Sequence, residues 1–322
     1  MPDHFCVSRQ TAEDFMRLFV NRLAYGIQRT KPLEDGTIPY YLAREWETKE
    51  PKPLQTDVLR MHLNGDVTIS LYAINPVTQS SKWVAIDADF DGSLEALFRL
   101  QWELRQDGVD AALEQSRRGG HLWIFGEKPM PAFQCRIYIY NLALRLGVPV
   151  KGGGLKEGIE VFPRQDQIKD GDYGNAIRGP LGVHRKSNRR YWFYEAAPTP
   201  EAQLAYLQGL KKLTAAELDT LTQGMTLPQA YRPPEPTAYV SRSPVSGSRE
   251  FRILDYVETT GKQDSRNWKA QCPSCAQGGR DRARNNLGIK ISDPRFYVCR
   301  AGCTKEDIRA ALGQPIRKSV MA

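Results

Sequence analysis

Two aspartates, Asp87 and Asp89, lie one residue apart in the apolar run of residues 83–90. Successive side chains of a strand point to opposite faces, so both carboxylates would leave the same face of a strand formed by this run. Two neighbouring carboxylates are costly to bury, because each opposes ionisation of the other and both lose hydration. Mg²⁺ or Mn²⁺ removes this cost, since these ions prefer oxygen ligands. The pattern indicates a metal site; the alternative is a strand that ends in a solvated turn at Asp91 and Gly92.

A histidine beside a basic loop is the second group that could do chemistry. Residues 111–116 and 121–125 are typical of two strands, and the four residues between them would close a hairpin. In that hairpin Ser116 and His121 would face each other across the turn. The loop contains two arginines and two glycines, which suit phosphate binding. The group suits binding of a nucleotide triphosphate better than nucleophilic attack on an ester, because no acidic partner for the histidine is evident from the spacing. The alternative is a histidine that only makes structural hydrogen bonds at the start of a strand.

Glu160 offers a third carboxylate. It is the charged residue of residues 159–162, and strand alternation sets it opposite Ile159 and Val161, which should face the core. Three carboxylates from neighbouring strands can hold two cations about 3.5–4 Å apart, which stabilises the attacking and leaving oxygens of a phosphoryl displacement. The alternative is an edge-strand glutamate that points to water.

Four cysteines have the spacing of a zinc site. Cys272 and Cys275 form a Cys-x2-Cys pair, and Cys299 and Cys303 form a Cys-x3-Cys pair further along the chain. Two such pairs make a closed tetrahedral Zn²⁺ site. Zinc binding is worth roughly 10–16 kcal/mol in small finger peptides at neutral pH, enough to fold a domain of this size. We therefore expect one structural Zn²⁺ ion.

The positive charge of the chain is confined to its last quarter. The 322 residues carry a formal net charge of +8. Residues 241–322 contain 16 Lys and Arg against 8 Asp and Glu, whereas residues 1–240 are balanced. A basic unit attached to a neutral one indicates that it docks a polyanion such as nucleic acid through its phosphates. The alternative is that the basic residues only keep a small domain in solution.

The segments around these groups alternate between strand and helix patterns. Residues 67–72 predict a strand, and leucines at helical spacing predict a helix that ends at Gly108. Prolines and serines mark a linker. We therefore expect a catalytic domain over residues 1–224, a linker over residues 225–248 and a zinc-binding domain over residues 249–322.

The sequence also bears on compartment and partners. No apolar run approaches the roughly 18 residues that span a bilayer. Residues 1–22 carry charges throughout and lack the apolar middle of a secretory signal. We expect a cytoplasmic protein, in host cytoplasm if it is viral, with no membrane contact and without structural disulfides. The sequence has no Gly-x4-Gly-Lys-Ser/Thr loop, so we expect any helicase partner to be encoded separately.

The order of these groups resembles the archaeo-eukaryotic primase superfamily, which includes primase-polymerases. The resemblance rests on Asp87-x-Asp89, then Ser116 and His121, then Glu160. The flanking sequences resemble the phage, plasmid and conflict-system branch, in residues 83–90, 121–125, 160–165 and 178–184. Four residues separate Ser116 from His121, where the compact form of the motif has one; longer versions occur in this branch.

The resemblance implies an architecture and an activity. The fold would be α/β (α+β), a primase catalytic core with an RRM-like, mixed or antiparallel sheet. Residues 296–303 and the helix expected after them resemble the zinc ribbons attached to bacterial and phage primases. The activity would be that of a DNA primase-polymerase, which synthesises primers and extends strands on single-stranded DNA from dNTPs or NTPs by two-metal nucleotidyl transfer.

The resemblance also assigns roles to single residues. Two Mg²⁺ or Mn²⁺ ions would be held by Asp87, Asp89 and Glu160. The phosphates of the incoming nucleotide would be bound by His121 and Arg118, with Ser116. Further candidates for nucleotide or template contacts are Arg178 and His184.

Three other functions fit part of the pattern. A metal-dependent nuclease also uses a carboxylate trio, but it needs no cradle for a triphosphate such as His121 and its loop. A zinc-ribbon DNA-binding initiator with an inactive large domain would have no use for the complete acidic set. A Toprim-type primase has its glutamate before the Asp-x-Asp pair, whereas Glu160 follows it.

Overall fold

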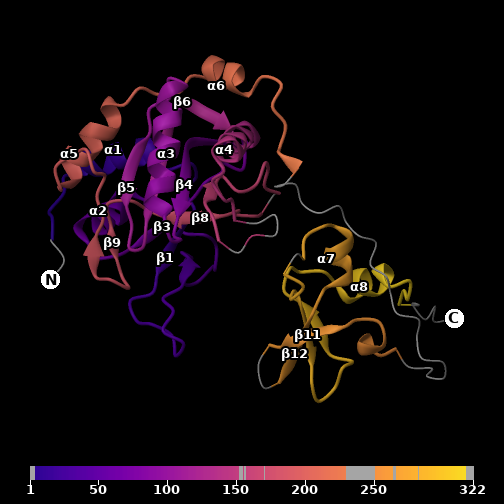
Figure 1. Ribbon diagram of the computed structural model, residues 1–322. Coiled ribbons are helices and arrows are strands. Elements are labelled where there is room, and N and C mark those ends of the chain that lie inside the picture. The colour runs from indigo at the N-terminus through magenta and orange to yellow at the C-terminus, as the bar shows by residue number, and fades with distance from the viewer. Residues whose placement is uncertain are drawn as a thin grey trace. The chain divides into compact units, whose positions relative to one another are not determined.

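The computed structural model describes residues 4–151, 155, 157–169, 171–229, 251–263, 266–281 and 283–316. The chain forms two compact units, Met1–Arg232 and Pro233–Ala322 (Figure 1). Most of the linker expected over residues 225–248 lies outside the described residues. None of the helices in these ranges combines the length and the apolar composition that a bilayer crossing requires.

The first unit mixes helices and strands. Its helices are α1 (Arg9–Phe19), α2 (Thr56–Asn64), α3 (Ser93–Gln106), α4 (Ala132–Leu146), α5 (Pro200–Gly209) and α6 (Ala215–Thr222). Its strands are β1 (Tyr25–Gln28), β2 (Tyr40–Leu42), β3 (Ile69–Tyr72), β4 (Ser80–Ala88), β5 (Ala112–Gln115), β6 (Gly120–Pro131), β7 (Glu160–Phe162), β8 (Ala176–Arg178), β9 (Val183–His184) and β10 (Arg189–Arg190).

The central sheet has the strand order β5-β6-β4-β7, and every neighbouring pair in it is antiparallel. Its elements follow the chain order β4-α3-β5-β6-α4-β7. This is the β-α-β-β-α-β arrangement of ferredoxin-like and RRM-like folds. The antiparallel α/β core expected from the sequence is therefore confirmed.

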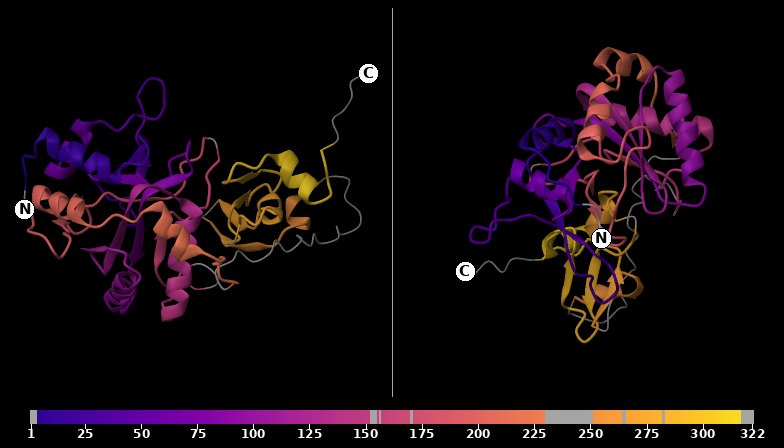
Figure 2. Two further views of the ribbon diagram at one scale, coloured as in Figure 1. Left: turned by 90° about the horizontal axis from the view of Figure 1, so that it is seen from above. Right: turned by 90° about the vertical axis from the view of Figure 1, so that its left-hand side faces the viewer.

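The two faces of the central sheet have different neighbours. On β4, Val84 and Ile86 belong to a core cluster with the apolar residues of α3 and α4, and these helices lie on the same side of the sheet (Figures 1 and 2). Trp83 and Ala85 belong to a second cluster on the opposite face. Asp87 continues this second face, because strand side chains alternate.

The second face of the central sheet looks toward another antiparallel sheet. That sheet has the strand order β2-β1-β3-β8. Phe15 and Phe19 of α1 pack with Trp83 and Trp123 in one cluster, together with Ile69 of the second sheet. Phe19 meets Trp123 edge to face, with ring centroids 5.3 Å apart. A shared apolar core therefore fixes the spacing between the two sheets.

The chain after β8 packs on the buried imidazole of His62. His62 is fully buried, and its Nε2 lies 3.0 Å from the Pro180 carbonyl oxygen. A Cβ atom built on Gly182 would lie 1.9 Å from a carbon of that ring. A glycine is therefore required where this segment crosses α2, and the crossing leads directly to His184.

The second unit is built on a small antiparallel sheet. Its elements are β11 (Thr259–Lys262), β12 (Asn267–Ala270), α7 (Pro273–Gln277), β13 (Leu287–Lys290), β14 (Tyr297–Cys299) and α8 (Lys305–Ala311), after a short 3₁₀ turn at Ile253–Asp255. The sheet order is β11-β12-β13-β14. Its core contains Leu287 and Ile289 of the sheet, Ile308 of α8 and the cysteines at the strand ends. This arrangement matches the small ribbon expected from the cysteine spacing.

Candidate active site and zinc centre

Four polar residues form one row across the central sheet. The strand register pairs Glu114 with His121, His121 with Asp87, and Asp87 with Glu160. The adjacent row on the same face is apolar and consists of Ala112, Trp123, Ala85 and Phe162. The polar row therefore marks the edge at which the core between the two sheets ends.

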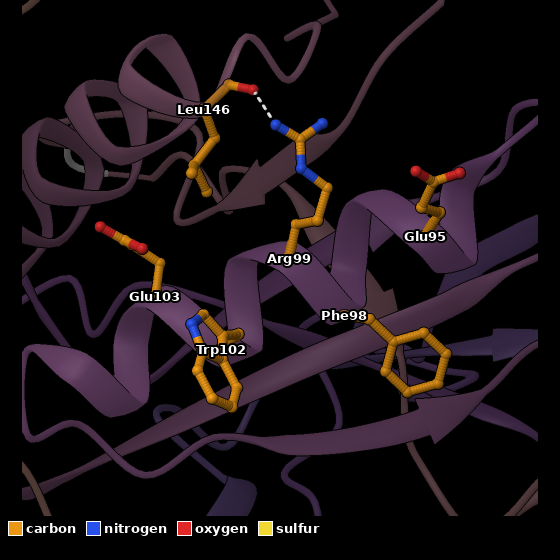
Figure 3. A pocket seen from close by; sticks show the side chains of 6 residues that line it. All are labelled: Glu95, Phe98, Arg99, Trp102, Glu103 and Leu146. Carbon is orange, nitrogen blue, oxygen red and sulfur yellow. Dashed lines mark hydrogen bonds between the residues drawn. The ribbon is translucent and has the colours of Figure 1, made fainter.

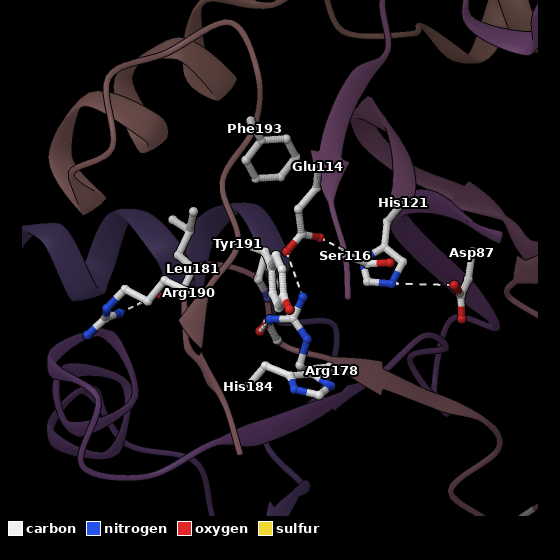
Figure 4. A network of polar contacts seen from close by, with 12 residues as sticks. Asp87, Glu114, Ser116, His121, Arg178, Leu181, His184, Arg190, Tyr191 and Phe193 are labelled. Atoms are coloured by element: carbon white, nitrogen blue, oxygen red, sulfur yellow. Dashed lines mark hydrogen bonds and ion pairs between the residues drawn. The ribbon is translucent and has the colours of Figure 1, made fainter. Parts of the chain in front are cut away.

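Glu114 is a member of this row that the sequence did not single out. Its side chain is fully buried. Its Oε2 accepts hydrogen bonds from His121 Nδ1 at 2.7 Å and from Trp123 Nε1 at 3.0 Å. Its Oε1 accepts from Arg178 Nη2 at 2.9 Å, and Arg178 comes from β8 of the other sheet (Figure 4). An acidic partner of His121 thus exists, although none was evident from the sequence.

The register also corrects the hairpin. Ser116 was expected to face His121 across the turn, but β6 begins at Gly120 and His121 is paired with Glu114. Ser116 lies in the loop, where its Oγ accepts a hydrogen bond from Gly119 N at 3.1 Å. A Cβ atom on Gly119 would lie 2.0 Å from the Ala88 carbonyl oxygen. Glycine at this position lets the loop pack against the end of β4, next to the aspartates.

His121 and Glu114 stabilise each other's charged forms. Burial alone would lower the pKa of His121, but the Glu114 carboxylate and the contact with Asp87 outweigh it and raise the pKa to about 9. Burial alone would raise the pKa of Glu114, but the charges of Arg178 and His121 keep it below its usual range. At neutral pH the row therefore presents an imidazolium between two carboxylates.

The three candidate metal ligands have basic neighbours. Asp89 pairs with Arg118, and Glu160 pairs with Lys151 and with Arg164. Asp87 Oδ1 lies 3.4 Å from His121 Nε2, yet this buried oxygen accepts no hydrogen bond from any described residue. Asp87 thus has a buried oxygen that faces the imidazole ring without accepting a hydrogen bond.

A cavity of about 280 Å³ opens over His121 and Asp87, the middle of the row. Its walls come from both sheets and from the Ser116 loop. They are formed by Gln28, Tyr40, Asp87, Asp89, Ser116, Arg117, Arg118, His121, Phe162, Ala176, Ile177, Arg178, His184 and Lys186. Both aspartates, the serine, the histidines and the arginines predicted from the sequence thus line one cavity. Glu160 is not among its walls, because its side chain turns to Lys151 and Arg164.

His184 contributes a neutral wall to this cavity. Burial and the nearby charges of Arg178 and Arg117 lower its pKa to about 4. Its Nδ1 accepts a hydrogen bond from Ser187 N at 3.2 Å. At neutral pH His184 therefore adds no positive charge, and because Nδ1 is the acceptor, its Nε2–H is left to donate a hydrogen bond.

A larger hollow, of about 590 Å³, lies on the outer surface of α3 and has a different character (Figure 3). Phe98 and Trp102 are exposed there. Arg99 donates a hydrogen bond to the Leu146 carbonyl oxygen at 2.6 Å. The hollow belongs to the α3 and α4 side of the sheet, away from the polar row, so it offers no site for the chemistry of Asp87.

A family model matches residues 30–221, which is more than half of the chain and contains the whole polar row. Its description is "TOTE conflict system, Archaeo-Eukaryotic Primase domain". The chain belongs to this family. It is therefore an enzyme of the primase type, a nucleotidyltransferase. The family recognised from the sequence motifs is confirmed.

Solved structures of primases and polymerases resemble the chain at low sequence identity. The catalytic domain of primase RepB′ in complex with initiator DNA is 13% identical, with a TM-score of 0.33, over 67% of this chain and 93% of that one. Primase RepB′ is 11% identical, with a TM-score of 0.35, over 67% and 62%. The polymerase domain of Mycobacterium tuberculosis ligase D in complex with DNA is 12% identical, with a TM-score of 0.31, over 66% and 85%. A search of curated proteins found no match.

The chemistry of the primase site fits a divalent cation. Asp87 supplies a buried carboxylate oxygen without a hydrogen bond, and Asp89 lies beside it in the same cavity. Oxygen atoms of this kind are the ligands that Mg²⁺ and Mn²⁺ prefer. Among the described residues, the acids do not form a compact ligand cluster by themselves, because Arg118 and Lys151 hold two of them. A cation would therefore bind in competition with these basic side chains.

The second unit brings its four cysteines together. The sulfur atoms of Cys272, Cys275, Cys299 and Cys303 all lie within 4.8 Å of one another. Zn–S bonds of about 2.3 Å in a tetrahedron place sulfur atoms about 3.8 Å apart, so the cluster has the right size for Zn²⁺. The predicted zinc ligands thus form one group.

A buried aspartate supports this cluster. Asp281 is 3% exposed and accepts hydrogen bonds from Cys272 N at 2.8 Å, Asn285 N at 3.0 Å and Asn286 N at 3.1 Å. It ties the first cysteine turn to the loop before β13. The sequence signal for Asp281 was weak, because it lies in a run of arginines and glycines.

Proposed function

We propose that this protein is a DNA primase-polymerase, which synthesises primers and extends strands on single-stranded DNA by two-metal nucleotidyl transfer. The observation that carries the proposal is the composition of the cavity. Its walls combine two aspartates with three basic side chains, His121, Arg117 and Arg118. A nucleoside triphosphate with its cations needs both kinds of group, whereas a nuclease site needs no basic side chains for a triphosphate.

The acidic residues would hold the cations. Asp87 offers a buried oxygen that accepts no hydrogen bond, Asp89 extends from the end of the same strand, and Glu160 lies beside Asp87 in the strand register. Two bound Mg²⁺ or Mn²⁺ ions supply activation of the 3′-hydroxyl group and neutralisation of the triphosphate charge. Glu160 reaches this position when its side chain leaves Lys151 and Arg164.

The cationic residues would bind the incoming nucleotide. Because Glu114 holds the Nδ1 atom of His121, the Nε2 atom, 3.4 Å from Asp87 Oδ1, is the ring nitrogen left for a phosphate. Arg118 is released when Asp89 binds a cation, and its guanidinium group then binds a phosphate. The Ser116 hydroxyl group, which already accepts a hydrogen bond, keeps its own proton for a phosphate oxygen. Arg178 and His184 line the same cavity and would contact the nucleotide or the template.

The second unit would bind the template. Phe296 and Val298 are exposed, and the Phe296 ring lies 5.3 Å from Lys290 Nζ and 5.8 Å from Lys305 Nζ. An exposed aromatic ring between cations suits a stacked base and its phosphates. We therefore assign catalysis to residues 1–224, a linker to residues 225–248 and zinc-dependent template binding to residues 249–322. A separately encoded helicase would supply the single strand.

The test of the proposal is incorporation of labelled nucleotide on a single-stranded template without a primer. We expect incorporation that depends on Mg²⁺ or Mn²⁺, and Asp87→Ala should lower both priming and extension at least about a hundredfold, because it removes the carboxylate on which cation binding depends. Asp91→Ala is the matched control, since Asp91 is exposed just beyond the site. Metal-dependent shortening of the template without synthesis would instead establish a nuclease.

A further inference from the structure

Glu114 is a buried acid that no predicted role uses. It is one of the few fully buried charged side chains among the described residues, and its carboxylate accepts three N–H groups. A lone buried carboxylate is strongly disfavoured, and removing one partner of a buried ion pair leaves the other charge buried and uncompensated. The cost is met here by the three N–H groups that the carboxylate accepts, and the same contacts restrict the side chains that donate them.

The contacts of Glu114 join the two sheets at the cavity. His121 comes from β6 of the central sheet, and Arg178 comes from β8 of the other sheet. Each cation occupies a different oxygen of the same carboxylate, at 2.7 Å and 2.9 Å (Figure 4). The Arg178 side chain is 9% exposed, so its position is set by protein contacts and not by water: the ion pair with Glu114 and a hydrogen bond to the Gly179 carbonyl oxygen at 3.3 Å. Both cations also line the cavity.

We propose that Glu114 is a positioning residue for nucleotide binding, which holds His121 and Arg178 as a preformed pair of triphosphate ligands drawn from the two sheets. The inference rests on the proposed function. It also explains the Trp123 contact, because Trp123 Nε1 bonds to the same oxygen as His121 and restricts the rotation of the carboxylate. Glu114 itself does not line the cavity and would touch neither nucleotide nor metal.

A positioning role predicts that loss of Glu114 weakens nucleotide binding much more than it lowers the catalytic rate. In Glu114→Gln the NH₂ group must face either Arg178 or the pair of His121 and Trp123, so the variant loses the Arg178 contact or the contact with the protonated His121. We expect the KM for dNTP and the dissociation constant of dNTP with Mg²⁺ to rise at least tenfold, while kcat changes less than threefold. A loss of folded protein alone would lower the apparent kcat and leave KM unchanged.

Two further variants make the test decisive. Glu127→Gln is the matched control, because Glu127 lies exposed on β6 and its variant should keep the wild-type KM. Glu114→Asp keeps the charge but shortens the side chain, so its KM should lie between those of the wild type and Glu114→Gln. If Glu114→Gln fails to fold, Glu114→Asp alone must raise KM at least threefold.

The outcomes distinguish this inference from the proposed function. A KM and a dissociation constant within twofold of the wild type in both Glu114 variants overturn the positioning role. Wild-type protein that binds dNTP without incorporating it contradicts the proposed function, and the dissociation constants of the variants still decide the inference. Wild-type protein that does not bind dNTP at all overturns both.

Discussion

At the scale of single residues, the site is neutralised by its own basic side chains. Arg118 holds Asp89 and Lys151 holds Glu160, and both contacts are partly exposed. Exposed ion pairs of this kind contribute about 0–1 kcal/mol. They are weak enough for a divalent cation to displace, and displacement frees an arginine next to the triphosphate. The cation and the nucleotide should therefore bind cooperatively through Arg118.

Replacing Arg118 should separate its competition with the cation from its binding of the nucleotide. In Arg118→Ala, Asp89 loses its competitor for the cation, so the Mg²⁺ concentration for half-maximal activity should fall, by up to about fivefold for a pair of this strength. The KM for dNTP should rise, because a phosphate ligand is lost. Steady-state incorporation measured at varied Mg²⁺ and at varied dNTP reports both values.

The matched control is Arg9→Ala. Arg9 forms an exposed ion pair with Glu13 on α1, and neither residue lines the cavity. This variant should leave both the Mg²⁺ midpoint and the KM unchanged. A Mg²⁺ midpoint in Arg118→Ala that is unchanged or higher would show that Arg118 does not compete with the cation.

At the scale of elements, strand register decides which residues meet. The Asp87 strand, the Glu160 strand and the antiparallel core followed from alternation and from the family motifs, because these signals are local. Glu114 did not follow, since a single acid in residues 111–116 looks the same whether it faces water or His121. The partner of His121 is Glu114, two residues before the expected Ser116, because the turn is closed by Ser116 N bonding to the Gly119 carbonyl oxygen. A shift of two residues keeps the same face of the strand, so the face pattern of residues 111–116 could not reveal it.

Residues 179–184 cross α2, and this contact can be tested by measuring the stability of a variant. Gly182→Ala should lower the free energy of unfolding by about 1–3 kcal/mol, because the new methyl group overlaps the buried His62 ring. Chemical denaturation measures the change. Gly209→Ala is the control, since nothing lies near its added Cβ atom; this variant should be neutral or slightly stabilising.

A double-mutant cycle identifies the cause of that loss. In a His62→Ala background the ring is absent, so Gly182→Ala should cost less than in the wild type. An equal cost in the two backgrounds would mean that Gly182 is needed for its backbone conformation and not for contact with His62.

At the scale of the whole molecule, charge and chemistry are divided between the two units. Residues 1–240 are balanced in formal charge and contain the acidic row, whereas residues 241–322 contain the full excess of +8 and the zinc cluster. A primer must be started on a strand that has no duplex to hold it. The basic unit can supply that hold through phosphate contacts, which are independent of sequence and sensitive to salt.

This division predicts that loss of zinc harms initiation more than elongation. Replacing Cys272 and Cys275 together by serine removes two of the four ligands, and the ribbon should unfold because its sheet is small and depends on the metal. We expect unprimed synthesis to fall at least tenfold and extension of a preannealed primer to fall less than threefold, because a duplex end already holds the template in the first unit. Both activities are measured on the same template, with zinc content determined by metal analysis.

Cys6→Ser is the control, since Cys6 is exposed and outside the cluster. An equal loss of priming and extension in protein whose first unit remains folded would show that the ribbon serves catalysis as a whole and not the start of the primer.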